Sequence, residues 1–213
     1  MLFAEEHARL LLVVHAVLGA ALVAVSTHLV VWMRGFPRGK FQRWRATRKF
    51  ALIAASLFLL ELLVGNAIYP VYKVRVRAEY LDLPGEVVRD LRDRMETRAR
   101  VHDRYQDERS GTARLDDEDP VISEPAVLAE SAELPRQTAR VALWFDVKEH
   151  WVALGAALSI TCCVILMAWR PRKHGRSIAT VVFLMALGAA LSAWLGALIG
   201  VLVTSYRSIG GIG

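Results

Sequence analysis

Four long apolar blocks constrain this chain more than any other feature of its sequence. They carry almost no charge and run from about Leu10 to Met33, Phe50 to Tyr69, Trp151 to Trp169 and Ile178 to Val203. Each block has about 20 residues or more, the length that an α-helix needs to cross ~30 Å of hydrocarbon at ~1.5 Å per residue. A soluble domain would instead spread its apolar residues along the chain in short periodic patterns. The sequence therefore predicts an all-α membrane protein with a bundle of four transmembrane helices.

The charges of the connecting segments predict how these spans are oriented. Residues 34–49 contain seven Lys and Arg and no acid, and residues 170–176 contain four Lys and Arg and no acid. Both segments should be cytoplasmic, because Lys and Arg are concentrated in cytoplasmic loops. We therefore expect a bacterial inner-membrane protein with both termini and the loop of residues 73–149 outside the cytoplasm. Topology and anionic lipid then account for the net charge of +6 without a nucleic-acid partner.

The loop of residues 73–149 is charged and is predicted to be mostly helical. It contains 14 Lys and Arg and 18 Asp and Glu. Pro84 to Arg109 has the helical spacing of a surface helix, Ser110 to Pro125 is typical of a flexible acidic linker, and a second helix is expected after Pro125. The sequence thus divides into two spans with a basic loop (residues 1–72), the charged loop (residues 73–149) and the last two spans (residues 150–213).

The junction between the second span and the loop contains two smaller signals. Pro70 is expected to end the second span, because proline disfavours a continuing helix. The following segment, Tyr72 to Arg77, alternates apolar and basic residues. This pattern predicts either a short extended segment or a basic interfacial anchor.

Small residues predict how two of the spans pack. The fourth span has a small residue at every fourth position, namely Gly188, Ser192, Gly196 and Gly200. Such a stripe allows the close backbone approach that stabilises helix pairs in lipid, although a groove for a flat ligand would need the same residues. Ala153, Ala157 and Thr161 repeat the pattern in the third span. We therefore expect the third and fourth spans to be direct neighbours.

Two histidines at matching depth suggest a haem site. His15 lies 19 residues before Arg34 and His150 lies 20 residues before Arg170, so both should lie near the outer face, at the level of Gly196 in the fourth span. Two imidazoles from different helices, with a small residue nearby, are what a b-type haem in a bundle requires. Alternatively, His150 faces water at the interface and His15 bonds a carbonyl group. His28 lies about 140° from His15 around the helix, which disfavours a second haem.

Glu61 is the one acidic residue deep within a predicted span, 12 residues from Lys49. A charged side chain at the bilayer centre costs ~2.5–3.5 kcal/mol or more, so such residues usually have a function. Glu61, with Asn66 one turn further along, is a candidate for proton handling. The alternative is a structural hydrogen bond to another span. The partners expected from depth are Ser159, Ser192 and His15.

The sequence contains no catalytic motif that would define an enzyme. It has no nucleophile–base set or phosphate loop, and its two cysteines, Cys162 and Cys163, are adjacent and lack metal-ligand spacing. We expect an integral membrane subunit of a larger respiratory or other redox complex, with other membrane subunits and the lipid bilayer as partners. It would bind at most one b-type haem and no other metal. The alternatives are a stand-alone structural or assembly protein and a proton-coupled transporter or channel.

Overall fold

The computed structural model describes residues 5–110, 134–169 and 176–206, which are helical almost throughout. The elements are η1 (Glu5–His7), α1 (Ala8–Met33), η2 (Phe36–Arg38), α2 (Trp44–Val71), η3 (Tyr72–Leu81), α3 (Pro84–Ser110), α5 (Leu134–Ala168) and α6 (Arg176–Tyr206). Four stretches are long and apolar enough to cross a membrane: Ala8–Arg38, Trp44–Leu81, Arg140–Ala168 and Ser177–Ser205. The prediction of an all-helical chain with four apolar helices long enough to cross a membrane is thereby confirmed for the described residues.

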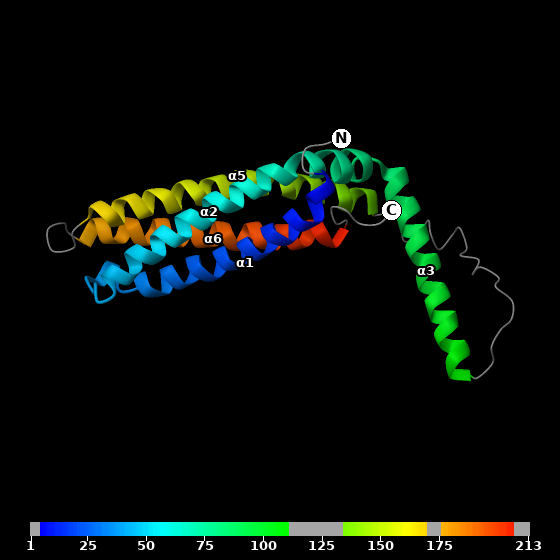
Figure 1. The fold of residues 1–213 in the computed structure, drawn as a ribbon, viewed down its shortest axis with the longest axis horizontal. Coiled ribbons are helices and arrows are strands. Elements are labelled where there is room, and N and C mark those ends of the chain that lie inside the picture. Colours follow the sequence, from blue (N-terminus) through cyan, green and yellow to red (C-terminus); the bar gives the residue numbers. More distant parts are fainter. Residues whose placement is uncertain (1–4, 111–133, 170–175, 207–213) are drawn as a thin grey trace. The chain divides into compact units, whose positions relative to one another are not determined.

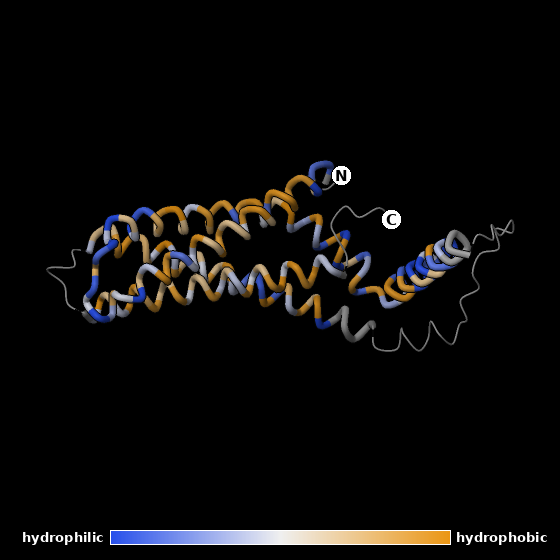
Figure 2. Tube along the Cα trace, turned by 90° about the horizontal axis from the view of Figure 1, so that it is seen from below, coloured by the Kyte–Doolittle hydropathy of each residue, from blue (hydrophilic) through white to orange (hydrophobic). Residues whose placement is uncertain are grey.

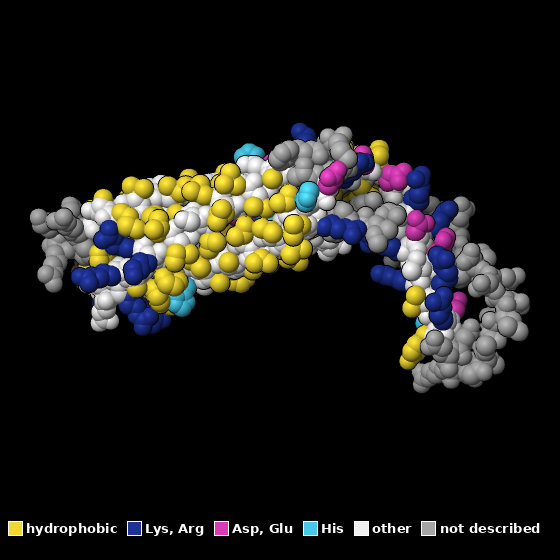
Figure 3. Space-filling model, viewed as in Figure 1, with side chains coloured by type: hydrophobic (Ala, Val, Ile, Leu, Met, Phe, Trp, Pro, Cys, Tyr) yellow, Lys and Arg dark blue, Asp and Glu magenta, His cyan; other side chains and the backbone are white. Residues whose placement is uncertain are grey.

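The four apolar helices run lengthwise beside one another and alternate in direction (Figure 1). The turn from α1 to α2 and the facing ends of α5 and α6 lie at one end of this bundle, which we call the turn end. Apolar residues predominate along the helices (Figure 2), and apolar side chains cover the visible surface of the bundle (Figure 3). Leu63 and Val201, for example, are 65% and 70% exposed. Such exposure suits lipid, which is as apolar as the side chains themselves.

The chain divides into two compact units, residues 1–73 with 143–213 and residues 74–142. The first unit contains the bundle. In the second unit, the Tyr80 hydroxyl donates a hydrogen bond of 2.7 Å to Asp90 of α3, and Arg94 pairs with the same Asp90 at 2.7 Å. The helix α3 lies where the sequence predicts a charged surface helix. Residues 111–125 of the predicted acidic linker lie outside the described residues.

Two predictions for the end of the second span were wrong, whereas the alternative of a basic interfacial anchor at residues 72–77 stays a prediction. Pro70 lies inside α2, and the chain continues as the π-helix η3 rather than as an extended segment. Proline removes one backbone donor from the helix, and a wider i→i+5 hydrogen-bonding pattern is one way for a helix to continue past such a defect. The candidate span that contains α2 consequently extends to Leu81.

The small-residue stripe of α6 lies against α5. A Cβ atom added at Gly188 would lie 3.0 Å from Leu158, and one at Gly196 would lie 3.0 Å from Val152. The Ser192 hydroxyl donates a short hydrogen bond to the Trp151 carbonyl. The predicted neighbours are therefore correct, but the predicted face of α5 is not: Ala153, Ala157 and Thr161 are exposed. The face of α5 that meets α6 instead includes Lys148, Val152, Gly155 and Leu158.

Aromatic side chains fill the turn end. Trp169, after α5, contacts Trp44 and Phe41 at centroid distances of 5.0 and 5.4 Å, and Phe36 packs against all three. Phe36 is 1% exposed and Trp169 is 4% exposed. The turn is closed by hydrogen bonds to Gly35 and Phe36 carbonyls, and Gly39 adopts a left-handed φ of 76° that a glycine accommodates without strain. We call Phe36, Phe41, Trp44 and Trp169 the aromatic cluster.

Candidate functional site: a histidine–glutamate pair between two spans

A histidine and a glutamate meet between α1 and α2. His15 Nδ1 lies 3.2 Å from Glu61 Oε1, and the two side chains are 19% and 11% exposed. The distance is that of an ion pair, but the geometry is not that of an aligned hydrogen bond, since Nδ1 has no hydrogen-bond partner among the described residues. Of the partners expected for Glu61, His15 is the one that the structure brings to it.

Two glycines make room for this pair in a reciprocal way. Gly19 follows His15 by one helical turn, and Gly65 follows Glu61 by one helical turn. A Cβ atom at Gly19 would lie 3.1 Å from Glu61 Oε1, and one at Gly65 would lie 3.4 Å from the His15 ring. Each polar side chain therefore occupies the space opposite a glycine of the other helix. The signal is present in the sequence as His-x-x-x-Gly and Glu-x-x-x-Gly in two antiparallel spans, but neither glycine was among the predicted site residues.

Lys148 supplies a third ionisable side chain, from α5, and Glu61 is one of two carboxylates near enough to act on it electrostatically. A Cβ atom added at Gly200 of α6 would lie 3.2 Å from Lys148 Nζ, so the side chain lies close to the α6 backbone. Lys148 was not among the predicted site residues, because the third span was expected to begin at Trp151, whereas the candidate span begins at Arg140. We call His15, Gly19, Glu61, Gly65 and Lys148 the charged layer.

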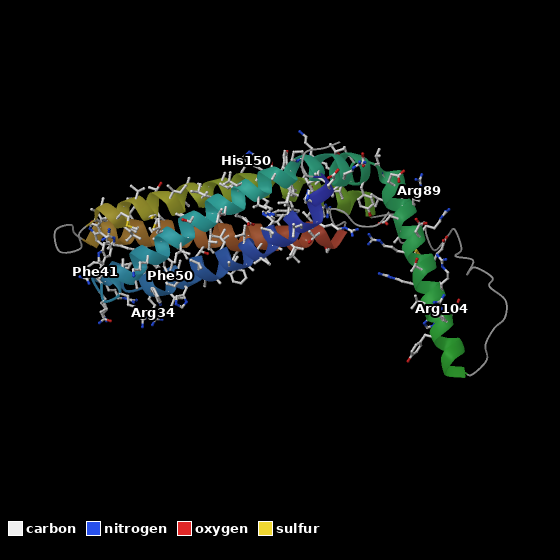
Figure 4. The ribbon with its side chains drawn as sticks, in the orientation of Figure 1. Arg34, Phe41, Phe50, Arg89, Arg104 and His150 are labelled. Carbon is white, nitrogen blue, oxygen red and sulfur yellow. The ribbon has the colours of Figure 1, made fainter. Side chains whose placement is uncertain are left out.

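The other predicted site residues lie elsewhere. His150 Nδ1 lies 2.9 Å from the carbonyl oxygen of Asp146 on the same helix, and the side chain is exposed. Figure 4 shows it on the outer edge of the bundle. Gly196, expected to leave space for a porphyrin, is in close contact with Val152. Asn66 is exposed, unlike Glu61. Among the described residues, no three His, Cys, Asp or Glu side chains gather as a metal site.

The charged layer brings together an imidazole and a carboxylate, two side chains that can exchange protons. Glu61 Oε2 is buried and has no hydrogen-bond partner among the described residues, which is costly for a carboxylate in an apolar surrounding. An imidazole at 3.2 Å can share a proton with that carboxylate, and histidine exchanges protons near neutral pH.

The fold and this layer define the class of protein: an all-helical protein with four candidate membrane spans and ionisable side chains between them. No family model, no curated protein and no solved structure matches the chain.

Proposed function

We propose that this protein is an integral membrane subunit of a larger redox complex, in which the His15–Glu61 pair holds and passes a proton. The observation that carries the proposal is the 3.2 Å contact between the two side chains inside the apolar spans. Ionisable groups at such depth are expensive and usually belong to proton or ion pathways. Lys148, on a third span, supports the proposal because it places a further ionisable side chain near the pair.

A larger complex is proposed because a proton-holding pair performs no reaction by itself. A redox reaction elsewhere in an assembly, such as the reduction of a quinone, takes up protons and gives the pair a role. The proposed arrangement is a bacterial inner-membrane subunit, with the basic turn of residues 34–43 in the cytoplasm and both termini outside. The Lys and Arg residues of that turn support this orientation.

The test is to purify the complex from its native membrane in mild detergent, with variants of the full chain. Glu61→Gln should retain the same partner subunits as the wild type but lose proton uptake during turnover, measured with a pH-indicator dye. Glu79→Gln removes an exposed carboxylate on η3 and should change neither property. Purification without partners, or unchanged proton uptake in Glu61→Gln, would refute the proposal.

The b-type haem between His15 and His150 stays a prediction, and a direct test is available. A carbonyl partner at Nδ1, as His150 has, leaves Nε2 of the same ring for a metal. Haem ligation predicts visible absorption in the purified protein that is lost in His150→Ala and retained in His28→Ala. A protein that binds no haem will lack this absorption, and the proton-holding role of the His15–Glu61 pair does not depend on it.

A further inference from the structure

A second feature of the molecule lies at the turn end, on the surface shared by α1 and α2. His28 and Trp32 of α1 contact each other at a centroid distance of 4.6 Å, and Trp32 contacts Phe50 of α2 at 4.5 Å. The Arg43 guanidinium lies 5.3 Å from the centre of the Trp32 ring. Figure 4 shows Phe50 at the same end of the bundle as Arg34 and Phe41. We call Trp32, Arg43, Lys49 and Phe50 the basic–aromatic surface.

The face of α2 that carries this surface changes from basic to apolar along its length. Arg43, Lys49, Phe50 and Ile53 fall within an arc of roughly 120° at 100° per residue. Arg43 and Lys49 are exposed, and Ile53, deeper in the span, is 45% exposed. On the neighbouring α1, Val31 is 48% exposed beside Trp32. Two cations, then aromatic rings, then lipid-facing aliphatic side chains follow the order of headgroup and acyl chain in an anionic phospholipid.

The cations of this surface differ from a neighbouring arginine that serves the fold. Arg48 Nη2 donates to the Met167 carbonyl at 3.2 Å, so this residue binds the last turn of α5. Arg43 instead lies over an indole ring near the bilayer boundary, where tryptophan is enriched. Residues 34–49 include no acid that would compete for these cations. Lys and Arg side chains gather at this end of the bundle in Figure 3.

We propose that the basic–aromatic surface binds the phosphate headgroup of an anionic phospholipid through Arg43 and Lys49. Trp32 holds the Arg43 guanidinium by a cation–π contact, which orders the side chain before lipid binds. The acyl chains lie along Ile53 and Val31. Basic residues next to a span attract anionic lipid, and each contributes to the affinity. This inference is independent of the His15–Glu61 proposal, because the two sites share no residue.

The test measures lipid binding to the full chain in detergent, by native mass spectrometry and by the thermal unfolding midpoint. Phosphatidylglycerol should bind and raise the midpoint, whereas phosphatidylcholine and inorganic phosphate should do neither. The double variant Arg43→Gln/Lys49→Gln should bind phosphatidylglycerol roughly 30-fold more weakly. The control Arg34→Gln/Lys40→Gln removes the same charge from the turn before α2 and should bind phosphatidylglycerol nearly as well as the wild type.

Three results would overturn the proposal. Equal weakening in the two double variants would mean that net charge attracts lipid without a specific site. Equal stabilisation by inorganic phosphate would mean that the surface binds a free anion rather than a lipid. No preference for phosphatidylglycerol would leave the surface to another partner, such as an acidic protein segment. If Arg43→Gln/Lys49→Gln fails to fold, Trp32→Leu tests the same surface, with weaker phosphatidylglycerol binding expected.

Discussion

The turn end and the charged layer use opposite means to join the same four helices. At the turn end, the large rings of Phe36, Trp44 and Trp169 meet, with Phe36 and Trp169 buried and Trp44 partly buried. In the charged layer, Gly19 and Gly65 lie opposite a carboxylate and an imidazole. The contact between large rings depends on their shapes, so substitution of one ring should disturb the packing of the others. Glycines instead leave space between the helices for polar side chains.

The comparison leads us to expect different roles for the two regions. A sequence that breaks the local preference for apolar residues in a span usually does so at a functional site, and the rest of the structure must supply the stability. The aromatic cluster and the close contact of α5 with α6 are placed to do this. Substitutions in the two regions should therefore differ in kind as well as in size.

The largest effect is expected at the aromatic cluster. Phe36→Ala should lower the free energy of unfolding by about 3–5 kcal/mol, because it leaves a cavity among three other rings. Unfolding in a denaturing detergent, followed by circular dichroism, measures this loss. Leu198→Ala changes a residue that is 62% exposed on α6 and should cost less than about 0.5 kcal/mol. Similar losses in the two variants would show that the cluster does not anchor the bundle.

The next effect is expected where α5 meets α6. A Cβ atom at Gly155 would lie 2.7 Å from Ser192 Cβ and 3.0 Å from Phe58, so Gly155→Ala should cost about 1–3 kcal/mol by overpacking. Gly200→Ala is the matched control, because the new methyl group meets only the mobile end of Lys148. The same unfolding assay should rank Gly155→Ala well below Gly200→Ala in stability. The reverse order would mean that the packing of α5 on α6 is not as described.

A smaller effect is expected from the His15–Glu61 pair. A double-mutant cycle with His15→Leu and Glu61→Leu should give a coupling energy of about 1 kcal/mol, as for other polar contacts between spans. His28→Leu combined with Glu61→Leu is the control and should be additive, since His28 contacts Trp32 and Phe50 instead. Additive effects for His15 and Glu61 would mean that the two side chains do not interact.

Hydropathy predicted the four spans well because their length and lack of charge are strong signals. The helix α3 was also predicted, from spacing alone. The packing face of α5 was not, since Ala153 and Gly155 are both small and only their contacts distinguish a lipid-facing from a buried position. Depth counting brought His15 and Glu61 to neighbouring levels, but it gave no rotation about the helix axis. The positions of Gly19 and Gly65 indicate which faces of α1 and α2 meet.

Lys148 shows a different limit of sequence reasoning. It lies among Asp146, Glu149 and other polar residues, which are typical of a water-exposed loop. Its place in the charged layer depends on α5 being continuous and on Gly200 of α6 leaving space for the ammonium. Neither condition follows from local composition.

Infrared difference spectroscopy of the protein in lipid vesicles tests most directly whether His15 and Glu61 share a proton. The difference between the spectra at acidic and alkaline pH should contain the band of a protonated carboxyl group in an apolar surrounding. This band should be absent in Glu61→Gln and present in Glu79→Gln. In His15→Leu the band should remain but titrate at a different pH. A band that survives in Glu61→Gln, or that titrates identically without His15, would contradict the account.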